Sequence, residues 1–413
     1  MMHSARERFQ QATALFVQGR HADAAPLLAE AVQAGDPEAQ NLFGVMHLNA
    51  LGMKQDTRRA VELFSAAANA ALKEAHYNLS NLLFNGIGIQ RDEVAGQRHL
   101  LEAARAGHRP ALRSLGYMYH LMGGSGDWAR LATACFEQAA FAGDPISKYN
   151  LGLRYLHGHG VDVDLARASQ WFAAAARDGM QRASLRLQAL QVPVAGHNVP
   201  PRALQDIPNL PGWTFAPLEM PPLLNNLSFL SEYGDVFDEY LCDHLINIGL
   251  PQLVPAGVVD PVTGEQERSE LRTSYSTHFR PSMYDAVIAR IWARLSQIAG
   301  LPAEHAEPLV VMRYGPGQEY KQHRDYFVDV KNKVKRLVTV FVYLNDVEEG
   351  GDTAFTRLGV SVQPEQGKAV KFLNYHADGK PNPDTLHAGL PVIRGEKWLA
   401  TLWFWDRPFM WFA

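Results

Sequence analysis

Features of a secreted, membrane-bound or disulfide-stabilised protein are scarce in this sequence. Its 413 residues include two cysteines, Cys135 and Cys242, each among apolar residues in a different half of the chain. We therefore expect buried, reduced thiols of a cytoplasmic protein. No apolar stretch approaches the roughly 18 residues of a membrane span, and the first residues lack the apolar centre of a signal peptide. No membrane association is expected.

An excess of positive charge is also lacking. The formal net charge is -4 and the isoelectric point is near 6.5. No broad basic surface is expected, so nucleic acid is not an expected partner. The chain is 47% hydrophobic and 20% charged, which is typical of a globular protein, and its length predicts more than one domain.

The first half of the chain repeats with a period of 36 residues. Small residues align at Gly44, Ser80, Gly116 and Gly152, and turn glycines at Gly52, Gly88, Gly124 and Gly160. Large apolar residues align at Leu28, Phe64, Leu100, Phe136 and Phe172, each followed three residues later by alanine. Such spacing predicts helix hairpins in which small residues allow neighbouring helices to approach closely and the large residue fills the gap between hairpins. Stacked hairpins of this kind form an α-solenoid.

The segment 150–179, NLGLRYLHGHGVDVDLARASQWFAAAARDG, resembles the Sel1-like class of tetratricopeptide-type repeats. The resemblance covers about residues 5–191, and the first unit departs from it by a shorter opening helix and a shorter turn around Gly19. It implies a scaffold whose concave face recruits a protein partner. A purely structural role, in which the solenoid stiffens or dimerises an enzyme, is the alternative.

Proline interrupts the repeat pattern over residues 192–225. The high density of proline in this segment excludes a long helix or a central strand and favours an extended path. Trp213 and Phe215 indicate that the segment lies along one or both domains. We therefore divide the chain into a repeat solenoid at 1–191, a proline-rich linker at 192–225 and a second domain at 226–413.

The second domain has two helical patterns followed by short strand-like runs. Apolar spacing predicts helices at 237–250 and 283–298, and a Thr-, Ser- and Tyr-rich run predicts a strand at 271–279. Five later runs alternate with Gly, Pro and Asp turns: PLVVMRY, KRLVTVFVYLND, KAVKFLN, LPVIRG and KWLATLWFW. This texture favours an antiparallel sandwich or barrel. A jelly roll with flanking helices is the expected architecture.

Metal-ligand chemistry is suggested by three residues of this domain. His323 and Asp325 stand two apart, so on a strand both side chains would leave the same face. His387 supplies a second imidazole. Two histidines and one carboxylate form the facial triad of non-haem Fe(II) oxygenases. A second pair of the same spacing, His376 and Asp378, lies in a Gly- and Pro-rich stretch and is expected in a surface loop.

Four motifs together resemble the prolyl 4-hydroxylase branch of the 2-oxoglutarate- and Fe(II)-dependent dioxygenases. They are RTS at 272–274, RYGPGQEYKQHRD at 313–325, YLNDVEEGGDTAF at 343–355 and HAGLPVIRGEKW at 387–398. The resemblance spans about residues 233–409. It implies a double-stranded β-helix, His323, Asp325 and His387 as ligands of catalytic Fe(II), and 2-oxoglutarate, O2 and ascorbate as further reactants.

The resemblance also assigns cosubstrate contacts. A buried carboxylate of 2-oxoglutarate needs a fixed cation, and Lys397 fits because it shares a strand face with Leu399, Thr401 and Trp403. Arg394 is the rival cation, but it precedes a glycine in an expected turn. Tyr314, Thr339 and Tyr343 are implied to line the cosubstrate pocket.

Four residues are implied to border a peptide substrate: Arg272, Tyr320, Arg336 and Trp403. Aromatic rings can stack on proline, and arginines can hold backbone carbonyls. The polar segment 260–268 is expected to act as a mobile flap over the entrance.

These expectations favour a hydroxylase of a peptide or protein, at proline, whose repeats recruit the target. Two alternatives remain open. One is a hydroxylase of a small molecule such as a free amino acid. The other is a binding scaffold without catalysis, against which the complete ligand set argues. Nucleic-acid dealkylation is disfavoured by the acidic balance of the chain.

Overall fold

The computed structural model divides the chain into two compact units, which are described separately. One comprises residues 1–216 and 284–289, and the other residues 217–283 and 290–413. The structure describes residues 5–123, 126–191, 218–259, 266–267, 271–326, 328–329 and 334–409. None of the described helices is long and apolar enough to cross a bilayer.

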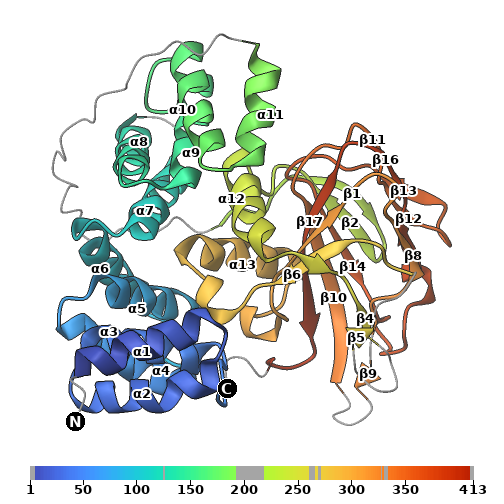
Figure 1. Cartoon of the computed structure of the whole chain (residues 1–413). Helices are drawn as coiled ribbons and strands as arrows, with labels where there is room; N and C mark the ends of the chain where they lie inside the picture. Colours follow the sequence, from blue (N-terminus) through green and yellow to red (C-terminus); the bar gives the residue numbers. More distant parts are fainter. Residues whose placement is uncertain are drawn as a thin grey trace. The chain divides into compact units, whose positions relative to one another are not determined.

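The first unit is the predicted α-solenoid. Its helices pair into successive hairpins, as Figure 1 shows in blue to green. They are α1 (Ala5–Val17), α2 (His21–Gln33), α3 (Pro37–Leu48), α4 (Thr57–Asn69), α5 (Lys73–Asn85), α6 (Glu93–Arg105), α7 (Arg109–Met122), α8 (Gly126–Phe141), α9 (Pro145–His157), α10 (Leu165–Arg177) and α11 (Gln181–Leu190). Aspartates cap several of them by accepting a backbone N–H, as Asp164 does for α10.

The aligned small residues allow the two helices of a hairpin to touch. A Cβ atom at Gly152 in α9 would lie 2.5 Å from the Phe172 ring in α10, closer than carbon atoms can approach. The same close approach occurs between Gly44 and Phe64 and between Gly116 and Phe136. The unit that has Ser80 at the glycine position has Leu100, without a ring, at the phenylalanine position. The predicted close approach at small residues is therefore confirmed, and the large residue that meets each glycine lies in the same hairpin, whereas it was expected in the gap between hairpins.

The turn glycines serve neighbouring units. Gly88 and Gly160 have positive φ angles, and a Cβ atom there would lie within 2.6 Å of the backbone of Thr57 and Ala129 in the preceding unit. The helices themselves end earlier, at the left-handed residues Gly86 and Gly158. Gly88 and Gly160 therefore turn the chain toward the next helix, as expected, and do not end the helix before it.

The first hairpin differs from its expected form in one respect. Its opening helix α1 has 13 residues, as many as α5 and α9, so the prediction of a shorter helix is wrong. The short turn is confirmed, because residues 18–20 alone separate α1 from α2. Gly19 supports this turn with a φ angle of 75°.

The second unit is an antiparallel jelly roll, as predicted. Its main sheet has the strand order β1-β2-β14-β10-β17-β7-β6-β3, with β9 pairing to β10. These strands are β1 (Leu223–Leu227), β2 (Leu230–Tyr233), β3 (Val254–Pro255), β6 (Tyr275–His278), β7 (Val310–Tyr314), β9 (Val328–Asp329), β10 (Val334–Tyr343), β14 (Ala369–Leu373) and β17 (Lys397–Trp405). The long pair β10 and β17 forms its centre, with Thr339 opposite Trp403.

A smaller sheet has the order β13-β12-β15-β8. Its strands are β8 (Tyr320–His323), β12 (Thr353–Phe355), β13 (Val360–Val362) and β15 (His387–Gly389). Two short pairs complete the strands: β4 (Val258–Val259) with β5 (Gln266–Glu267), and β11 (Glu349–Gly350) with β16 (Val392–Arg394). In the register of β15 and β8, His387 lies opposite His323. Two ligand candidates far apart in sequence thus become neighbours across one strand pair.

Both predicted helices are present as α12 (Glu239–Gly249) and α13 (Ala286–Ala299). Asp238 caps α12 by accepting the Leu241 N–H at 3.0 Å. Gly249 contacts Val311 on β7, whose neighbours Val310 and Met312 face the opposite way, into the cavity described below. The alternation of β7 therefore separates a helix-covered outer face from an inner face.

The proline-rich segment continues as an edge strand at its end. Its residues 192–217 lie outside the described part of the chain, while β1 begins at Leu223 and pairs with β2. An edge position agrees with the exclusion of a central strand.

Candidate active site

A cavity of about 400 Å³ lies between the main and the smaller sheet. The main sheet contributes Tyr314, Thr339 and Trp403 to its wall, and the smaller sheet contributes Tyr320, His323 and His387. Leu399, Thr401, Trp403 and Trp405 all line it from alternate positions of β17. The strand-parity prediction for β17 is thereby confirmed for these positions.

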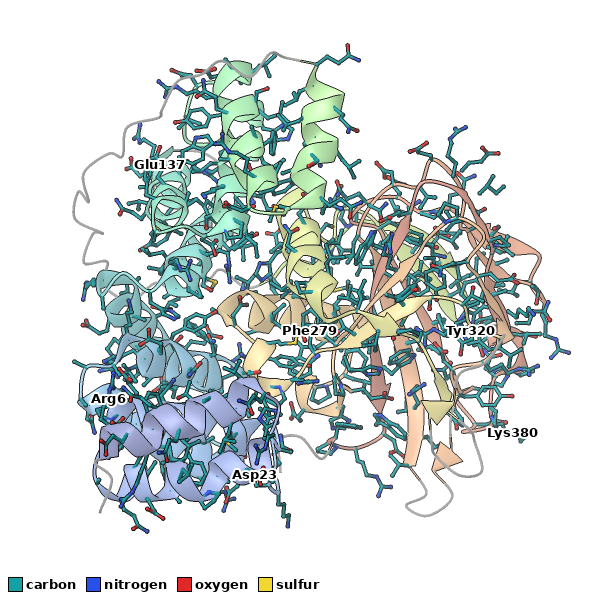
Figure 2. All side chains as sticks on the ribbon, in the orientation of Figure 1. Arg6, Asp23, Glu137, Phe279, Tyr320 and Lys380 are labelled. Carbon is teal, nitrogen blue, oxygen red and sulfur yellow. The ribbon has the colours of Figure 1, made fainter. Side chains whose placement is uncertain are left out.

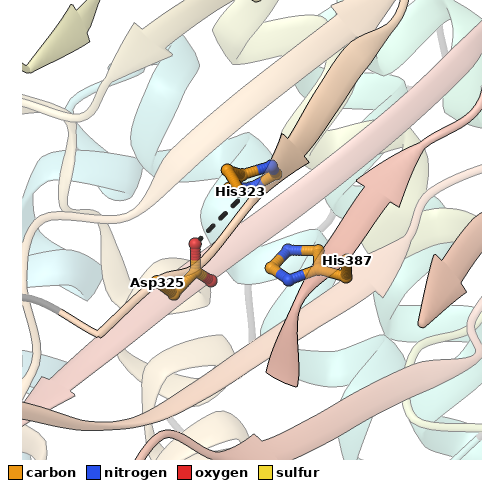
Figure 3. Close-up of side chains that lie close together, drawn as sticks. All are labelled: His323, Asp325 and His387. Carbon is orange, nitrogen blue, oxygen red and sulfur yellow. Dashed lines mark ion pairs between the residues drawn. The ribbon is translucent and has the colours of Figure 1, made fainter. Parts of the chain in front are cut away.

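Two imidazoles and one carboxylate meet at one point of this cavity. Figure 3 shows His323, Asp325 and His387 turned toward one another, and their ligand atoms all lie within 4.8 Å of each other. His323 Nε2 is 3.6 Å from Asp325 Oδ1. The cluster is the one group of three or more His, Cys, Asp or Glu side chains with metal-binding spacing among the described residues.

Asp325 reaches the cluster differently from the expectation of a regular strand. Strand β8 ends at His323, so Asp325 lies beyond it and two other side chains orient the carboxylate. Thr339 Oγ1 donates to Asp325 Oδ2 at 2.9 Å, and Trp403 Nε1 donates to the same oxygen at 3.0 Å. With Oδ2 engaged in this way, Oδ1 is available to a metal ion.

The two histidines present the same nitrogen to the cluster. His323 Nδ1 donates to the Lys321 carbonyl at 2.9 Å, and His387 Nδ1 donates to the Thr385 carbonyl at 2.8 Å. A ring whose Nδ1 hydrogen is used in this way presents Nε2 to a metal ion. Burial, followed by the proximity of His387, lowers the pKa of His323 to about 3, so this ring is neutral at physiological pH.

The carboxyl of Asp325 has opposing influences on its pKa. Burial would raise it, but His387, His323 and the Arg336 guanidinium outweigh this effect and hold the pKa below its usual value. The cluster thus combines an ionised carboxylate with a neutral imidazole, which is the donor set that a divalent metal such as Fe(II) requires.

Lys397 is buried beside the cavity. It is 1% exposed, and its Nζ lies 5.4 Å from the Tyr314 ring centre and 5.6 Å from that of Tyr343. A Cβ atom at the cavity residue Gly389 would lie 3.6 Å from Nζ, so the absence of a side chain there leaves the ammonium next to the cavity. Burial lowers the pKa of Lys397 to about 7. No hydrogen-bond acceptor engages this amine among the described residues.

The other three predicted cosubstrate residues differ in position. Tyr314 lines the cavity with its ring. Thr339 lines it as well, but its hydroxyl is already used to orient Asp325. Tyr343 lies behind the wall, where its hydroxyl donates to Thr353 Oγ1 at 2.8 Å and can also reach the Val362 carbonyl at 3.0 Å.

Arg272 and Tyr320 form one side of the cavity mouth. The Arg272 guanidinium lies 5.0 Å from the centre of the Tyr320 ring, and that ring stacks on His323 at 3.5 Å. Arg272 Nε donates to Ser274 Oγ at 3.0 Å, while its buried Nη2 has no hydrogen-bond partner. This side of the cavity can therefore offer an N–H donor to a ligand.

Arg336 and Trp403 form the opposite side. The guanidinium of Arg336 lies 4.6 Å from the Trp403 ring and donates to the Asp325 carbonyl at 3.3 Å. It also pairs with Glu307, at 2.7 Å from Nε. Sequence reasoning missed Glu307, because an acidic residue ahead of a predicted strand carries no motif. Burial raises the pKa of Glu307, against the effect of Arg336.

Both rival features named from the sequence lie at the surface. Arg394 is 66% exposed in its side chain and pairs with Glu348 at 2.8 Å. His376 and Asp378 occupy an exposed loop, in which Asp378 accepts the Lys380 N–H at 3.0 Å. Both surface predictions are confirmed. The expected flap lies outside the described residues apart from β5.

A jelly roll that brings two imidazoles and one carboxylate together in its cavity has the architecture of a non-haem iron oxygenase. Residues 309–405 match the family described as the 2OG-Fe(II) oxygenase superfamily. Residues 37–72, 73–108 and 145–180 match the Sel1 repeat.

Two similar curated proteins come from Arabidopsis thaliana. Probable prolyl 4-hydroxylase 6 is 38% identical over 199 residues, which are 43% of this chain and 69% of the relative. Probable prolyl 4-hydroxylase 3 is 37% identical over 193 residues, which are 41% of this chain and 67% of the relative. Against other prolyl 4-hydroxylases of this plant the chain spans as little as 63% of the relative's length. The chain belongs to the prolyl 4-hydroxylase family of 2OG-Fe(II) oxygenases.

Solved structures similar to each unit are also known. The viral collagen prolyl hydroxylase of Paramecium bursaria Chlorella virus-1 shares 30% identity over 44% of this chain and 97% of its own, with a TM-score of 0.36. A Sel1 repeat protein from Oxalobacter formigenes shares 26% identity over 44% of this chain and 72% of its own, with a TM-score of 0.40.

Proposed function

We propose that this chain is a 2-oxoglutarate- and Fe(II)-dependent dioxygenase that hydroxylates proline in a peptide or protein. The observation that carries this proposal is the convergence of His323, Asp325 and His387 within 4.8 Å inside the cavity. The prolyl 4-hydroxylase names of the curated relatives support proline as the target.

Fe(II) would be held by Nε2 of the two histidines and Oδ1 of Asp325. With 2-oxoglutarate and O2, it supplies the oxidising chemistry, in which 2-oxoglutarate is converted to succinate and CO2 and one oxygen atom enters a substrate C–H bond. The chain itself fixes the donor atoms, through the Lys321 and Thr385 carbonyls and the two donors on Asp325 Oδ2.

Lys397 would bind the distal carboxylate of 2-oxoglutarate. A buried amine with a pKa near 7 and no acceptor among the described residues gains a partner when an anion enters, and the anion favours the protonated form. Tyr314 lies at this end of the cavity, and Thr339 lines the cavity while its hydroxyl holds Asp325.

The peptide would enter at the other end, between the Arg272–Tyr320 and Arg336–Trp403 pairs. Arg272 Nη2 can donate to a backbone carbonyl, and the Tyr320 and Trp403 rings can border a proline ring. The solenoid would recruit the protein that carries this peptide, as repeat surfaces commonly do. We assign the protein to the cytoplasm, since Cys135 and Cys242 are buried outside any disulfide.

Mass spectrometry tests this proposal. Candidate proteins are incubated with the chain, Fe(II), ascorbate and 2-oxoglutarate, and a gain of one oxygen on proline is sought. The control is Asp325→Ala, which should give no such gain. Deletion of residues 1–191 should preserve 2-oxoglutarate consumption without target but reduce target modification; equal modification would leave the repeats a structural role.

A hydroxylase of a free amino acid is the second candidate, favoured by the cavity volume of about 400 Å³, which would enclose such a molecule. Oxygen incorporation into free proline, with none into any protein, would decide for it. Absence of Fe(II) binding under anaerobic conditions would instead favour a scaffold without catalysis.

A further inference from the structure

A group of aromatic and basic side chains continues from the cavity mouth over the neighbouring surface. We call Arg324, Tyr326, Tyr375 and Lys335 the aromatic strip. Tyr326 lines the cavity, and its ring centre lies 6.2 Å from that of Tyr375. Arg324 lies 5.9 Å from the Tyr326 ring centre, and Lys335 Nζ lies 5.1 Å from that of Tyr375. The four side chains thus form one continuous series of contacts that begins at the cavity.

The charges of the aromatic strip are unbalanced. Within the described part of the chain, neither Arg324 nor Lys335 has a carboxylate partner, and Lys335 Nζ is held by the Gly379 carbonyl at 3.1 Å. Two acidic residues nearby have their own basic partners: Asp378 pairs with Lys380 at 3.0 Å and Asp406 with Arg407 at 3.4 Å. Two cations are therefore available to an acidic ligand.

A buried hydroxyl gives a second, independent indication of a ligand. Tyr375 is 8% exposed, and its hydroxyl has no hydrogen-bond partner. Leaving such a group unsatisfied typically costs on the order of 1–3 kcal/mol. A ligand carbonyl or carboxylate would satisfy it.

We propose that the aromatic strip is a subsite for the part of a peptide that extends out of the cavity, and that it selects peptides with acidic residues beside the target proline. This inference rests on the proposed function, since it presumes a peptide in the cavity. Aromatic faces suit the rings of an extended proline-rich segment, and Arg324 and Lys335 suit its carboxylates. The loop 376–380, from which Lys380 projects in Figure 2, holds Lys335 in place through Gly379.

Direct binding measurements test this proposal without turnover. Three fluorescein-labelled peptides share a Pro-Ala-Pro-Ala-Pro core and carry glutamate, glutamine or lysine flanks on both sides. Fluorescence anisotropy gives their affinities for the full chain loaded with Zn(II) and 2-oxoglutarate. We expect the glutamate peptide to bind most tightly and the lysine peptide most weakly, with about a threefold loss at each step at low salt.

Substitutions separate the contributions of the aromatic strip. Lys335→Gln should lower the affinity for the glutamate peptide about threefold and leave the affinity for the glutamine peptide unchanged. Tyr375→Phe should lower the affinity for all three peptides about fivefold, because the hydroxyl can no longer bond the ligand. It should not lower the melting temperature of the chain, because that hydroxyl has no partner in the ligand-free protein. Matched controls are Lys368→Gln, whose lysine precedes β14 and so lies at the other end of that strand from Tyr375, and Tyr275→Phe, a partly exposed tyrosine on β6; neither should change any affinity.

Other outcomes would overturn the subsite. Equal affinities for the glutamate and lysine peptides, binding of none of the three, or an unchanged glutamate preference in Lys335→Gln would each do so. Displacement of the glutamate peptide by an oligothymidine strand at lower concentration than by unlabelled peptide would point to single-stranded nucleic acid instead. Failure of the proposed function has a different signature: the peptides bind as expected, but Fe(II) and 2-oxoglutarate place no oxygen on them.

Discussion

Each unit of this chain buries a cation completely, and the two cations are treated differently. Arg154 in the solenoid donates from Nε to Thr133 Oγ1 and from Nη2 to the Ala129 carbonyl, both at 2.6 Å. Lys397 in the jelly roll lies against two aromatic rings, and the described residues offer its amine no acceptor. The solenoid therefore gives Nε and Nη2 of its buried guanidinium an acceptor each, whereas the described residues of the jelly roll leave the Lys397 amine for a ligand to satisfy.

The difference extends beyond these two residues. The jelly roll also leaves Arg272 Nη2 and the Tyr375 hydroxyl buried without a partner. Such groups are costly in a protein interior and are expected where a ligand will meet them. At the jelly-roll cavity, Arg272 Nη2 and the Lys397 amine lie where a peptide and a cosubstrate would meet them.

The largest expected effect concerns the metal ligands. Asp325→Ala should reduce 2-oxoglutarate turnover below detection, by more than the roughly 10–100-fold loss typical of an outer-shell partner. The matched control is Asp378→Ala in the exposed HxD pair, which should leave turnover unchanged. Succinate formation measures both. Equal losses in the two variants would refute the assignment of the triad.

The comparison of the buried cations is tested by removing both. Lys397→Met should weaken the binding of 2-oxoglutarate at least ~30-fold, which corresponds to a loss of about 2 kcal/mol of binding free energy or more. The ligand-free variant should be as stable as the original chain or more stable, because a buried unpaired amine is removed. Arg154→Met should destabilise the solenoid by about 3 kcal/mol and leave cosubstrate affinity unchanged. Calorimetry gives both quantities. Arg394 forms the exposed ion pair with Glu348. If Arg394→Gln weakened 2-oxoglutarate binding more than Lys397→Met does, Arg394 would be the residue that holds the cosubstrate carboxylate.

Packing inside a hairpin gives the next effect. Gly152→Ala should destabilise the solenoid by about 1–3 kcal/mol, because its Cβ would overlap the Phe172 ring. The double variant Gly152→Ala with Phe172→Leu, which copies the Ser80 and Leu100 combination, should regain part of this loss. Thermal unfolding of the four chains of this cycle measures the coupling. Additive losses would show that ring contact is not the cause.

The smallest expected effect is a proton uptake. Burial lowers the pKa of Lys397 from 10.5 to about 7, so between these values the unfolded chain holds a proton that the folded chain lacks. The free energy of unfolding should therefore rise with pH across this range. Binding of the 2-oxoglutarate anion should restore the proton. Titration calorimetry at pH 8 in buffers of different ionisation enthalpy should show uptake of up to about one proton, absent in Lys397→Met.

Much of the active site was accessible from sequence, because its chemistry depends on residue types at fixed spacing. The motifs identified His323, Asp325, His387 and Lys397, and strand parity predicted the inward face of β17. What spacing could not show was how Asp325 is held, since it lies past the end of β8 and depends on Trp403 from a distant strand.

Residues that act through tertiary contacts were harder to find. Glu307 has no motif of its own and acquires its place by pairing with Arg336, 29 residues later in the chain. Thr339 was expected at the cosubstrate, but its hydroxyl bonds Asp325 beside Trp403, which lies opposite Thr339 in the register of β10 and β17. The aromatic strip combines residues from the segment after β8, from β10 and from the segment after β14, and no local pattern joins them.

The glycines of the solenoid have a consequence for how its length can change. Contacts inside a hairpin match particular side chains, such as Gly152 with Phe172, whereas Gly88 and Gly160 meet only main-chain atoms or a single Cβ of the hairpin before. Main-chain atoms are the same for every residue type, so these contacts do not depend on the side chains of the preceding hairpin. Gene duplication or loss of a whole 36-residue module would therefore keep the small-to-large pairs intact and disturb only side-chain contacts between hairpins, such as that of Arg154 with Thr133, while recombination within a module would set Ser80 against a phenylalanine ring.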